Sequence, residues 1–216
     1  MTPSTPVTLL FSILASGLFF GHSDARSGSP EGSSTSAPLV GTSPTLAPFQ
    51  HVRFCLRYPA ECKSNPNGGG VIDLTDENSQ LLNRVNRGVN AAIAPVSKGY
   101  RMGTQETWRI GPIMGDCNDY AVTKRHELLQ RGLPATALRL AVVTTASGSG
   151  HLVLLAATTK GDLVLDNLTE AILPWQSADY HWLKVQSARD PRLWYATKGP
   201  AASLRQADLK LRSAQP

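Results

Sequence analysis

The sequence lacks any run of five charges of one sign, and it lacks any apolar stretch of eighteen residues. The first absence means that the net charge of +5, from 21 Lys and Arg against 16 Asp and Glu, marks no basic patch of the kind that binds nucleic acid or a membrane surface. After the first 25 residues, the second absence leaves no candidate for an ordinary transmembrane helix. We therefore expect no nucleic-acid partner and no stable membrane insertion of the mature chain.

Charged residues are also few, at 17%, while hydrophobic residues make up 41% of the chain. This balance is too apolar for a wholly disordered protein. A length of 216 residues fits one domain with extensions. The 18 Gly and 15 Pro predict sizeable loops.

The first 25 residues have the pattern of a signal peptide. Residues 7–20 carry no charge, and this stretch is too short to span a hydrocarbon core of about 30 Å but suits a signal hydrophobic region. Ser23 and Ala25 supply small residues at the positions that a signal peptidase reads. We expect residues 1–25 to be a signal peptide and the protein to be periplasmic or secreted; an uncleaved anchor is the alternative.

The rest of the chain divides by composition. Residues 26–48 are dominated by Ser, Gly, Thr and Pro, which predicts a disordered linker. Residues 49–199 carry the apolar patterns of a folded domain, and residues 200–216, with a thin apolar stripe, predict a flexible tail. Within the domain, residues 76–93 have helical periodicity, to which we assign no chemistry.

Only three cysteines are present. Cys55 and Cys62 lie seven positions apart with Pro59 between them, which favours a disulfide in an exported protein. A reduced pair is the alternative, and a zinc site is disfavoured because no paired Cys or His lies nearby in the sequence.

Cys117 is the remaining cysteine. Gly115 marks a loop before it, and Gly132 and Pro134 end the helical pattern that follows. This places Cys117 in the first turn of a helix, where free amide N–H groups and the helix dipole favour the reactive thiolate.

A general base and its partner are found further along. His151 opens an apolar run that resembles a strand, Lys160 and Gly161 form a tight turn, and Asp166 ends the next strand. In such a hairpin, His151 and Asp166 lie at the same open end, so the carboxylate can hold the imidazole while its other nitrogen faces a thiol. Taken singly, each residue also fits a polar strand end or a turn. Residues 137–145 predict a further strand, and the Cys117 helix packed on this antiparallel sheet gives an α+β fold.

Several of these segments resemble the bacterial transglutaminase-like cysteine proteinases: GDCNDYAVTKRHELLQRGLPATALRLAVV, GHLVLLAATTKGDLVLDNL and the upstream FC…C element. The similarity covers residues 49–197. It implies the papain-like transglutaminase core, with Cys117 as nucleophile, His151 as general base and Asp166 as the residue that orients it. It further implies an endopeptidase acting on a protein substrate through a thioester acyl-enzyme. Transglutaminase or deamidase chemistry on the same triad, and a non-catalytic binding module, are the alternatives.

The oxyanion donors are less closely defined. The backbone N–H of Cys117 is the first candidate. Gln105 or Trp108 is the candidate for the second donor, and the alternative for Trp108 is a structural ring packed under the site.

The resembled family includes periplasmic members that cleave surface adhesins and depend on calcium held by acidic residues around the cysteine. Asp116 and Asp119 match those positions, but Asn118 stands where the calcium-dependent members have Glu. The three residues form a candidate calcium site with one carboxylate fewer, and a surface adhesin is the corresponding candidate substrate. The alternative is that the two aspartates only stabilise the helix N-terminus. The chemistry itself requires no cofactor.

Overall fold

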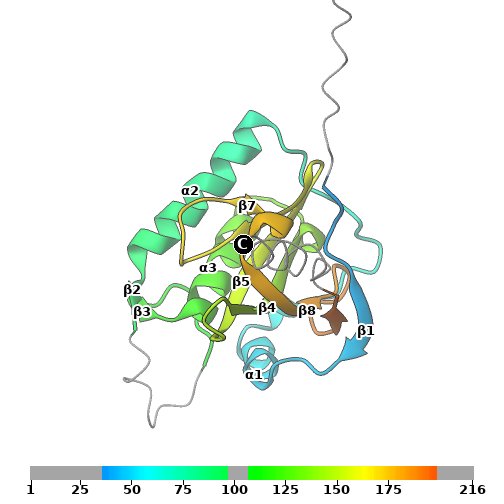
Figure 1. Cartoon of the computed structure of the whole chain (residues 1–216), viewed down its shortest axis with the longest axis horizontal. Helices are drawn as coiled ribbons and strands as arrows, with labels where there is room; N and C mark the ends of the chain where they lie inside the picture. Colours follow the sequence, from blue (N-terminus) through cyan, green and yellow to red (C-terminus); the bar gives the residue numbers. More distant parts are fainter. Residues whose placement is uncertain (1–35, 97–106, 199–216) are drawn as a thin grey trace, which may run out of the picture. The chain divides into compact units, whose positions relative to one another are not determined.

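The computed structural model describes residues 36–96 and 107–198, all within one compact unit, Ser33–Pro216. Its centre is a seven-stranded antiparallel sheet with helices packed against it (Figure 1). The strands, in the order in which they neighbour one another, are β1 (Gly41–Thr45), β9 (Trp194–Thr197), β8 (Tyr180–Gln186), β4 (Leu138–Thr145), β5 (Gly150–Thr158), β6 (Gly161–Leu165) and β7 (Leu173–Pro174). The predicted α+β class is confirmed.

Three helices and a small second sheet complete the described chain. The helices are α1 (Phe49–Arg57), α2 (Asp76–Ala92) and α3 (Cys117–Gln130), and the short 3-10 helices are η1 (Pro59–Cys62), η3 (Ala135–Ala137) and η4 (Trp175–Ser177). Strands β2 (Ala94–Pro95) and β3 (Met114–Gly115) pair in parallel just before α3.

The central strands are apolar on both faces, because each face of the sheet is covered. On β5, Leu152 and Leu154 join the cluster that contains the apolar residues of α2 and α3. Val153 and Leu155 alternate with them and join a second cluster built around Trp182. Figure 1 shows α3 between α2 and strands β4 and β5, and α3 contacts both α2 and β5. The sheet thus provides a rigid support for the start of α3.

The segment predicted to be a linker is folded where the structure describes it, so that prediction is wrong for residues 36–48. Leu39 is buried, and its N–H donates to Oδ2 of Asp162 at 2.8 Å. Strand β1 pairs with β9 at the sheet edge. Gly161, at φ 104°, leaves no room for a Cβ, which would lie 2.6 Å from the carbonyl oxygen of Ser36. Backbone pairing and one buried leucine thus order a segment whose composition is polar.

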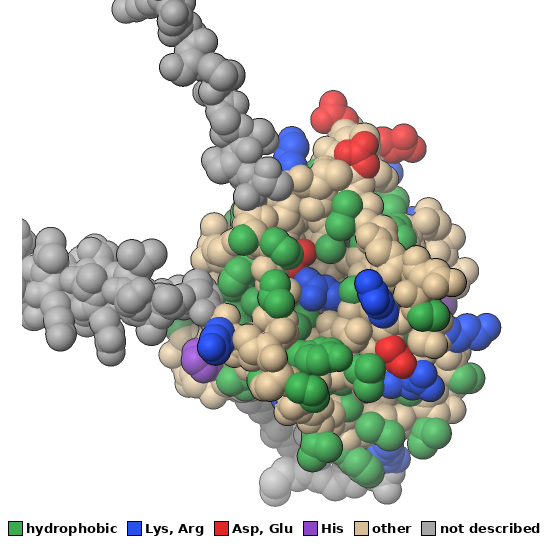
Figure 2. Space-filling model, turned by 90° about the vertical axis from the view of Figure 1, so that its right-hand side faces the viewer, with side chains coloured by type: hydrophobic (Ala, Val, Ile, Leu, Met, Phe, Trp, Pro, Cys, Tyr) green, Lys and Arg blue, Asp and Glu red, His purple; other side chains and the backbone are tan. Residues whose placement is uncertain are grey.

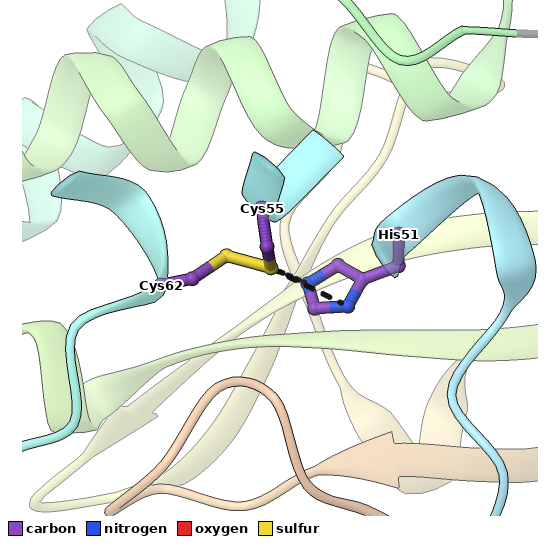
Figure 3. Close-up of side chains that lie close together, drawn as sticks. All are labelled: His51, Cys55 and Cys62. Atoms are coloured by element: carbon purple, nitrogen blue, oxygen red, sulfur yellow. Dashed lines mark hydrogen bonds between the residues drawn. A yellow bond between two sulfur atoms is a disulfide. The ribbon is translucent and has the colours of Figure 1, made fainter. Parts of the chain in front are cut away.

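The predicted disulfide joins Cys55 on α1 to Cys62 at the end of η1 (Figure 3). Within the loop that it closes, Glu61 binds the guanidinium of Arg125 at 2.8 Å and Nδ1 of His126 at 2.6 Å. Both partners lie on α3. The loop therefore ties α1 and η1 to the helix that begins with Cys117.

Basic side chains form no continuous region on the face that Figure 2 displays, the side on which β1 is drawn in Figure 1. There, Lys and Arg side chains are separated by hydrophobic and uncharged ones. Among the helices of the described residues, none combines the length and the hydropathy needed to cross a membrane.

Candidate active site

Cys117 is the first residue of α3, as the sequence predicts. Asp116 is the N-cap and accepts the N–H of Asn118 at 3.1 Å, while Oδ2 of Asp119 accepts the N–H of Asp116 at 3.2 Å. Gly115 is required before this capping box, because a Cβ there would lie 2.6 Å from Oδ2 of Asp119. The capping box fixes the direction in which the helix starts and hence the position of the thiol.

The capping arrangement leaves one amide of the first turn unused. The Asp116 side chain accepts hydrogen bonds from the backbone N–H groups of Asn118 and Asp119, and its carbonyl accepts one from the N–H of Tyr120. Among the described residues, no acceptor pairs with the N–H of Cys117. Cys117 is partly exposed and is the free cysteine of the protein. Its thiol and its own N–H are therefore available to a ligand at the positive end of the helix.

His151 and Asp166 are in contact, as the predicted hairpin requires. Nε2 of His151 lies 2.8 Å from Oδ1 of Asp166, and both side chains are buried. In the hairpin of β5 and β6, Leu154 pairs with Leu165, so the next residue, Asp166, lies opposite Val153. Val153 is two residues from His151 along the chain. The two side chains meet diagonally, which lies within the reach of long side chains on a sheet.

The His151 imidazole interacts electrostatically with both Asp166 and Cys117. Burial opposes its positive charge, but hydrogen bonds and the charges of Asp166 and Cys117 outweigh burial and raise the pKa of His151 to about 9. Burial also acts on Asp166, yet its bonds to His151 and Tyr180 hold the pKa of that carboxyl below its ordinary value. The structure thus brings His151 and Asp166 into contact, with Cys117 near enough to favour the charged form of the imidazole.

Tyr180 is a residue of this site that the sequence did not indicate. Its hydroxyl donates to Oδ2 of Asp166, and its ring centroid lies 5.6 Å from that of His151. Burial, followed by the bond to Asp166, raises the pKa of Tyr180. Because β7 and η4 separate the two residues along the chain, no local spacing links them.

Asp166 accepts two further hydrogen bonds, one from a backbone N–H and one from a side chain on α2. The N–H of Leu168 donates to Oδ1 at 3.1 Å, and Nδ2 of Asn90 donates to the Asp166 carbonyl at 2.9 Å. The carboxylate is therefore fixed on several sides, as an orienting residue must be.

Of the two side chains considered as second oxyanion donors, Gln105 lies outside the described residues. Trp108 is 4% exposed, and its ring packs against His51 and Phe54 with centroids 5.5 and 6.2 Å away. Trp108 is thus a buried ring packed against α1.

The candidate calcium residues are already engaged with protein donors. Asp119 is fully buried, and its Oδ1 accepts the N–H of Arg109 at 2.8 Å while the Arg109 guanidinium lies 3.4 Å from Oδ2. Nδ2 of Asn118 donates to Oδ2 of Asp116, 3.2 Å away, which ties this side chain to the helix cap. Calcium needs several hard oxygens, and in this arrangement Asp116 and Asp119 already use theirs for the helix cap and for Arg109, so an ion would compete with those contacts. We assign calcium no step in the chemistry.

His51 is a core residue although it lies beside the disulfide (Figure 3). Its Nε2 is 3.6 Å from the Cys55 sulfur, and burial, helped by the charge of Arg125, lowers the pKa of His51 to about 4. Among the described residues, His51, Cys55 and Cys62 form the only cluster of three His, Cys, Asp or Glu side chains with metal-ligand spacing. The disulfide occupies both sulfurs, so the cluster is structural.

Comparison with known proteins agrees with the resemblance seen in the sequence. The family model described as bacterial transglutaminase-like cysteine proteinase matches residues 41–201, about three quarters of the chain. No curated protein matches the sequence.

Solved structures with similarity include three of Legionella pneumophila LapG. One is 25% identical, covering 66% of this chain and 81% of that one, with a TM-score of 0.47. An EGTA-treated form is 24% identical over 66% and 82%, and a calcium-bound form is 22% identical over 66% and 83%, both with a TM-score of 0.47.

Proposed function

Because the chain belongs to the bacterial transglutaminase-like cysteine proteinase family, we propose that it is a cysteine endopeptidase with Cys117, His151 and Asp166 as its catalytic triad. The observation that carries this proposal is the buried contact of 2.8 Å between His151 and Asp166, with Cys117 near enough to act electrostatically on the same imidazole. This arrangement supplies a nucleophile, a proton carrier and an orienting carboxylate in one place.

In the proposed reaction, the Cys117 thiolate attacks a peptide carbonyl carbon and forms a new C–S bond. The imidazolium of His151 then gives its proton to the leaving amine as the C–N bond breaks, which leaves a thioester. Water, deprotonated by the now neutral His151, attacks the thioester carbon; the C–S bond breaks, which releases the new carboxyl terminus and restores the Cys117 thiolate beside the imidazolium. Asp166 keeps Nε2 of the imidazole engaged throughout, so that the other nitrogen faces the sulfur.

The tetrahedral intermediates carry an oxyanion, for which the N–H of Cys117 is the proposed donor. This amide has no acceptor within the described chain and lies at the positive end of α3. A donor of this kind stabilises charge that develops only during the reaction.

The proposed substrate is a protein, in agreement with the family. We propose further that the signal-like residues 1–25 direct export and that the substrate is a periplasmic or cell-surface protein, such as an adhesin. These proposals rest on the sequence alone, and fractionation of cells producing the full chain tests the first of them.

Acyl transfer to an amine and glutamine deamidation would use the same thioester. The experiment that separates these reactions incubates the purified protein with an unfolded, glutamine-containing polypeptide and identifies the products by mass spectrometry. The proposal predicts chain cleavage that is absent in Cys117→Ala. Ammonia release or isopeptide formation on intact chains would instead establish transfer, and no product of any kind would favour a binding module.

A further inference from the structure

A second buried titratable side chain lies on the same helix as the nucleophile. Lys124 is seven residues after Cys117, about two helical turns, which puts both residues on one side of α3. Its side chain is 0% exposed, and its Nζ has no hydrogen-bond partner in the described part of the chain. A lysine ammonium has three donors, and buried donors are normally satisfied. Lys124 therefore needs a partner that the protein side chains do not supply.

Two unsatisfied acceptors occur on the neighbouring helix. Oδ1 of Asn86 and Oδ1 of Asn90 are buried without a donor in the described chain. The amide nitrogens of the same residues donate to the carbonyls of Glu170 and Asp166, at 3.1 and 2.9 Å. Both asparagines, one helical turn apart on α2, thus contact the segment that follows β6.

Asn86 and Asn90 lie on α2, which packs on α3, the helix of Lys124. An ordered water in this α2–α3 layer, which makes two to four hydrogen bonds in protein interiors, would supply a partner for groups of this kind. The layer also adjoins the site, because Asn90 binds the carbonyl of Asp166 and Lys124 interacts electrostatically with the Asp166 carboxylate.

We propose that Lys124 is a positioning residue of the active site, which supports the ionised Asp166 from beneath by its charge and through a buried water shared with Asn86 and Asn90. The assignment rests on the proposed function, since it is through Asp166 and His151 that Lys124 acts on Cys117. Lys124 contacts neither the thiol nor a substrate.

The charge on Lys124 is consistent with this role. Burial lowers the pKa of Lys124 to about 7, and the negative charge of Asp166 opposes that effect. Asp166 is the charged group that acts on Lys124 among the described residues, from the end of β6; α2 contributes the neutral Asn86 and Asn90. A nearby positive charge favours the ionised form of a carboxylic acid. Removal of that charge should therefore let Asp166 take up a proton at a higher pH.

The test is the pH dependence of Cys117 alkylation by iodoacetamide in Lys124→Met, with Lys160→Met in the exposed β5–β6 turn as the matched control. Because alkylation needs no substrate, it remains informative whether or not the protein cleaves peptides. The expected result is that the acid limb of the alkylation profile moves to higher pH by about half a unit or more in Lys124→Met only. Its thermal midpoint should stay close to that of the wild type, because methionine fills the volume of the buried lysine stem and Nζ makes no hydrogen bond to a protein group in the described chain.

Asn90→Ala is the second variant, and a smaller shift of the same limb is expected from it. The proposal is overturned if the alkylation profile does not move in folded Lys124→Met or Asn90→Ala. It is also overturned if the alkylation rate falls only in proportion to a fall in thermal midpoint. A shifted profile in a protein that cleaves no polypeptide would refute the proposed endopeptidase and leave the role of Lys124 standing.

Discussion

Tyr180 donates its hydroxyl hydrogen to Oδ2 of Asp166, the carboxylate whose Oδ1 contacts His151. The tyrosine comes from the start of β8, and the aspartate from the end of β6. One carboxylate is thus shared between an imidazole and a phenol, which fixes its plane and leaves it no freedom to rotate away from His151.

Replacement of Tyr180 by Phe removes one hydrogen bond to this carboxylate and keeps the ring beside His151. We expect kcat/KM on a cleaved polypeptide to fall about tenfold, the effect of losing roughly 1.4 kcal/mol of a bond to a charged group. The thermal midpoint should change little. Tyr195→Phe on β9 is the control, and an equal loss in both variants would contradict a specific role for Tyr180.

The triad itself predicts a graded series. Cys117→Ala and His151→Ala should abolish turnover, because each removes a reacting group. Asp166→Asn should retain a residual rate lower by roughly 10²- to 10⁴-fold, because the imidazole remains but loses the charge that orients it. Steady-state kinetics together with circular dichroism measure both activity and fold. Full activity in any one of these folded variants would remove that residue from the mechanism.

The raised pKa of His151 predicts a pH dependence of stability. The ordinary value of 6.5 applies to the unfolded chain, and in the folded protein Asp166 and Cys117 outweigh burial to raise the pKa to about 9. The protonated imidazole therefore stabilises the fold fully below pH 6.5, and this contribution is lost as the pH rises through about 9. The difference in free energy of unfolding between the wild type and His151→Gln, from urea denaturation, should shrink over this interval. A difference that stays constant from pH 6 to 10 would contradict the assignment.

The disulfide should contribute to stability and little to chemistry. Cys55 and Cys62 close a short loop, and substitution of both by Ser should lower the free energy of unfolding by about 2 kcal/mol. This corresponds to a fall in thermal midpoint of roughly 4–8 °C. The alkylation rate of Cys117 should stay near that of the wild type at temperatures where the variant is folded. A large fall in that rate would show that the loop, through Glu61 and Arg125, also sets the start of α3.

Calcium should have little effect on this protein. The carboxylate of Asp119 is buried against Arg109, and Asn118 presents an amide nitrogen to Asp116. We expect millimolar calcium or EGTA to leave the thermal midpoint unchanged in the wild type. A saturable rise in the midpoint with calcium, abolished in Asn118→Ala, would show that the capping box opens to bind the ion.

The sequence predicted those parts of the site that depend on local signals. The start of α3 follows from Gly115, Asp116 and the apolar spacing after Cys117, and the contact between His151 and Asp166 follows from counting residues across one tight turn. Both involve segments close in sequence, where turn chemistry and periodicity determine the geometry.

Features that depend on distant segments were missed for a physical reason. Strand β1 has a linker-like composition, and it is ordered by pairing with β9, about 150 residues later. Tyr180 reaches Asp166 only because β8 and β6 belong to the same folded sheet. Lys124 is fully buried in the folded protein, although nothing in its local sequence distinguishes it from an exposed helical lysine. In each case tertiary packing determines the environment, and the local sequence carries no sign of it.

The pairing of Cys117 with His151 is the central claim, and the most direct test is the rate of iodoacetamide alkylation of Cys117 as a function of pH in the wild type and in His151→Ala. We predict fast alkylation that extends well below pH 8.5, the ordinary pKa of a free thiol, and that is lost in the variant. Ordinary thiol reactivity that is the same in both proteins would contradict an activated pair and would favour a binding module that retains the fold.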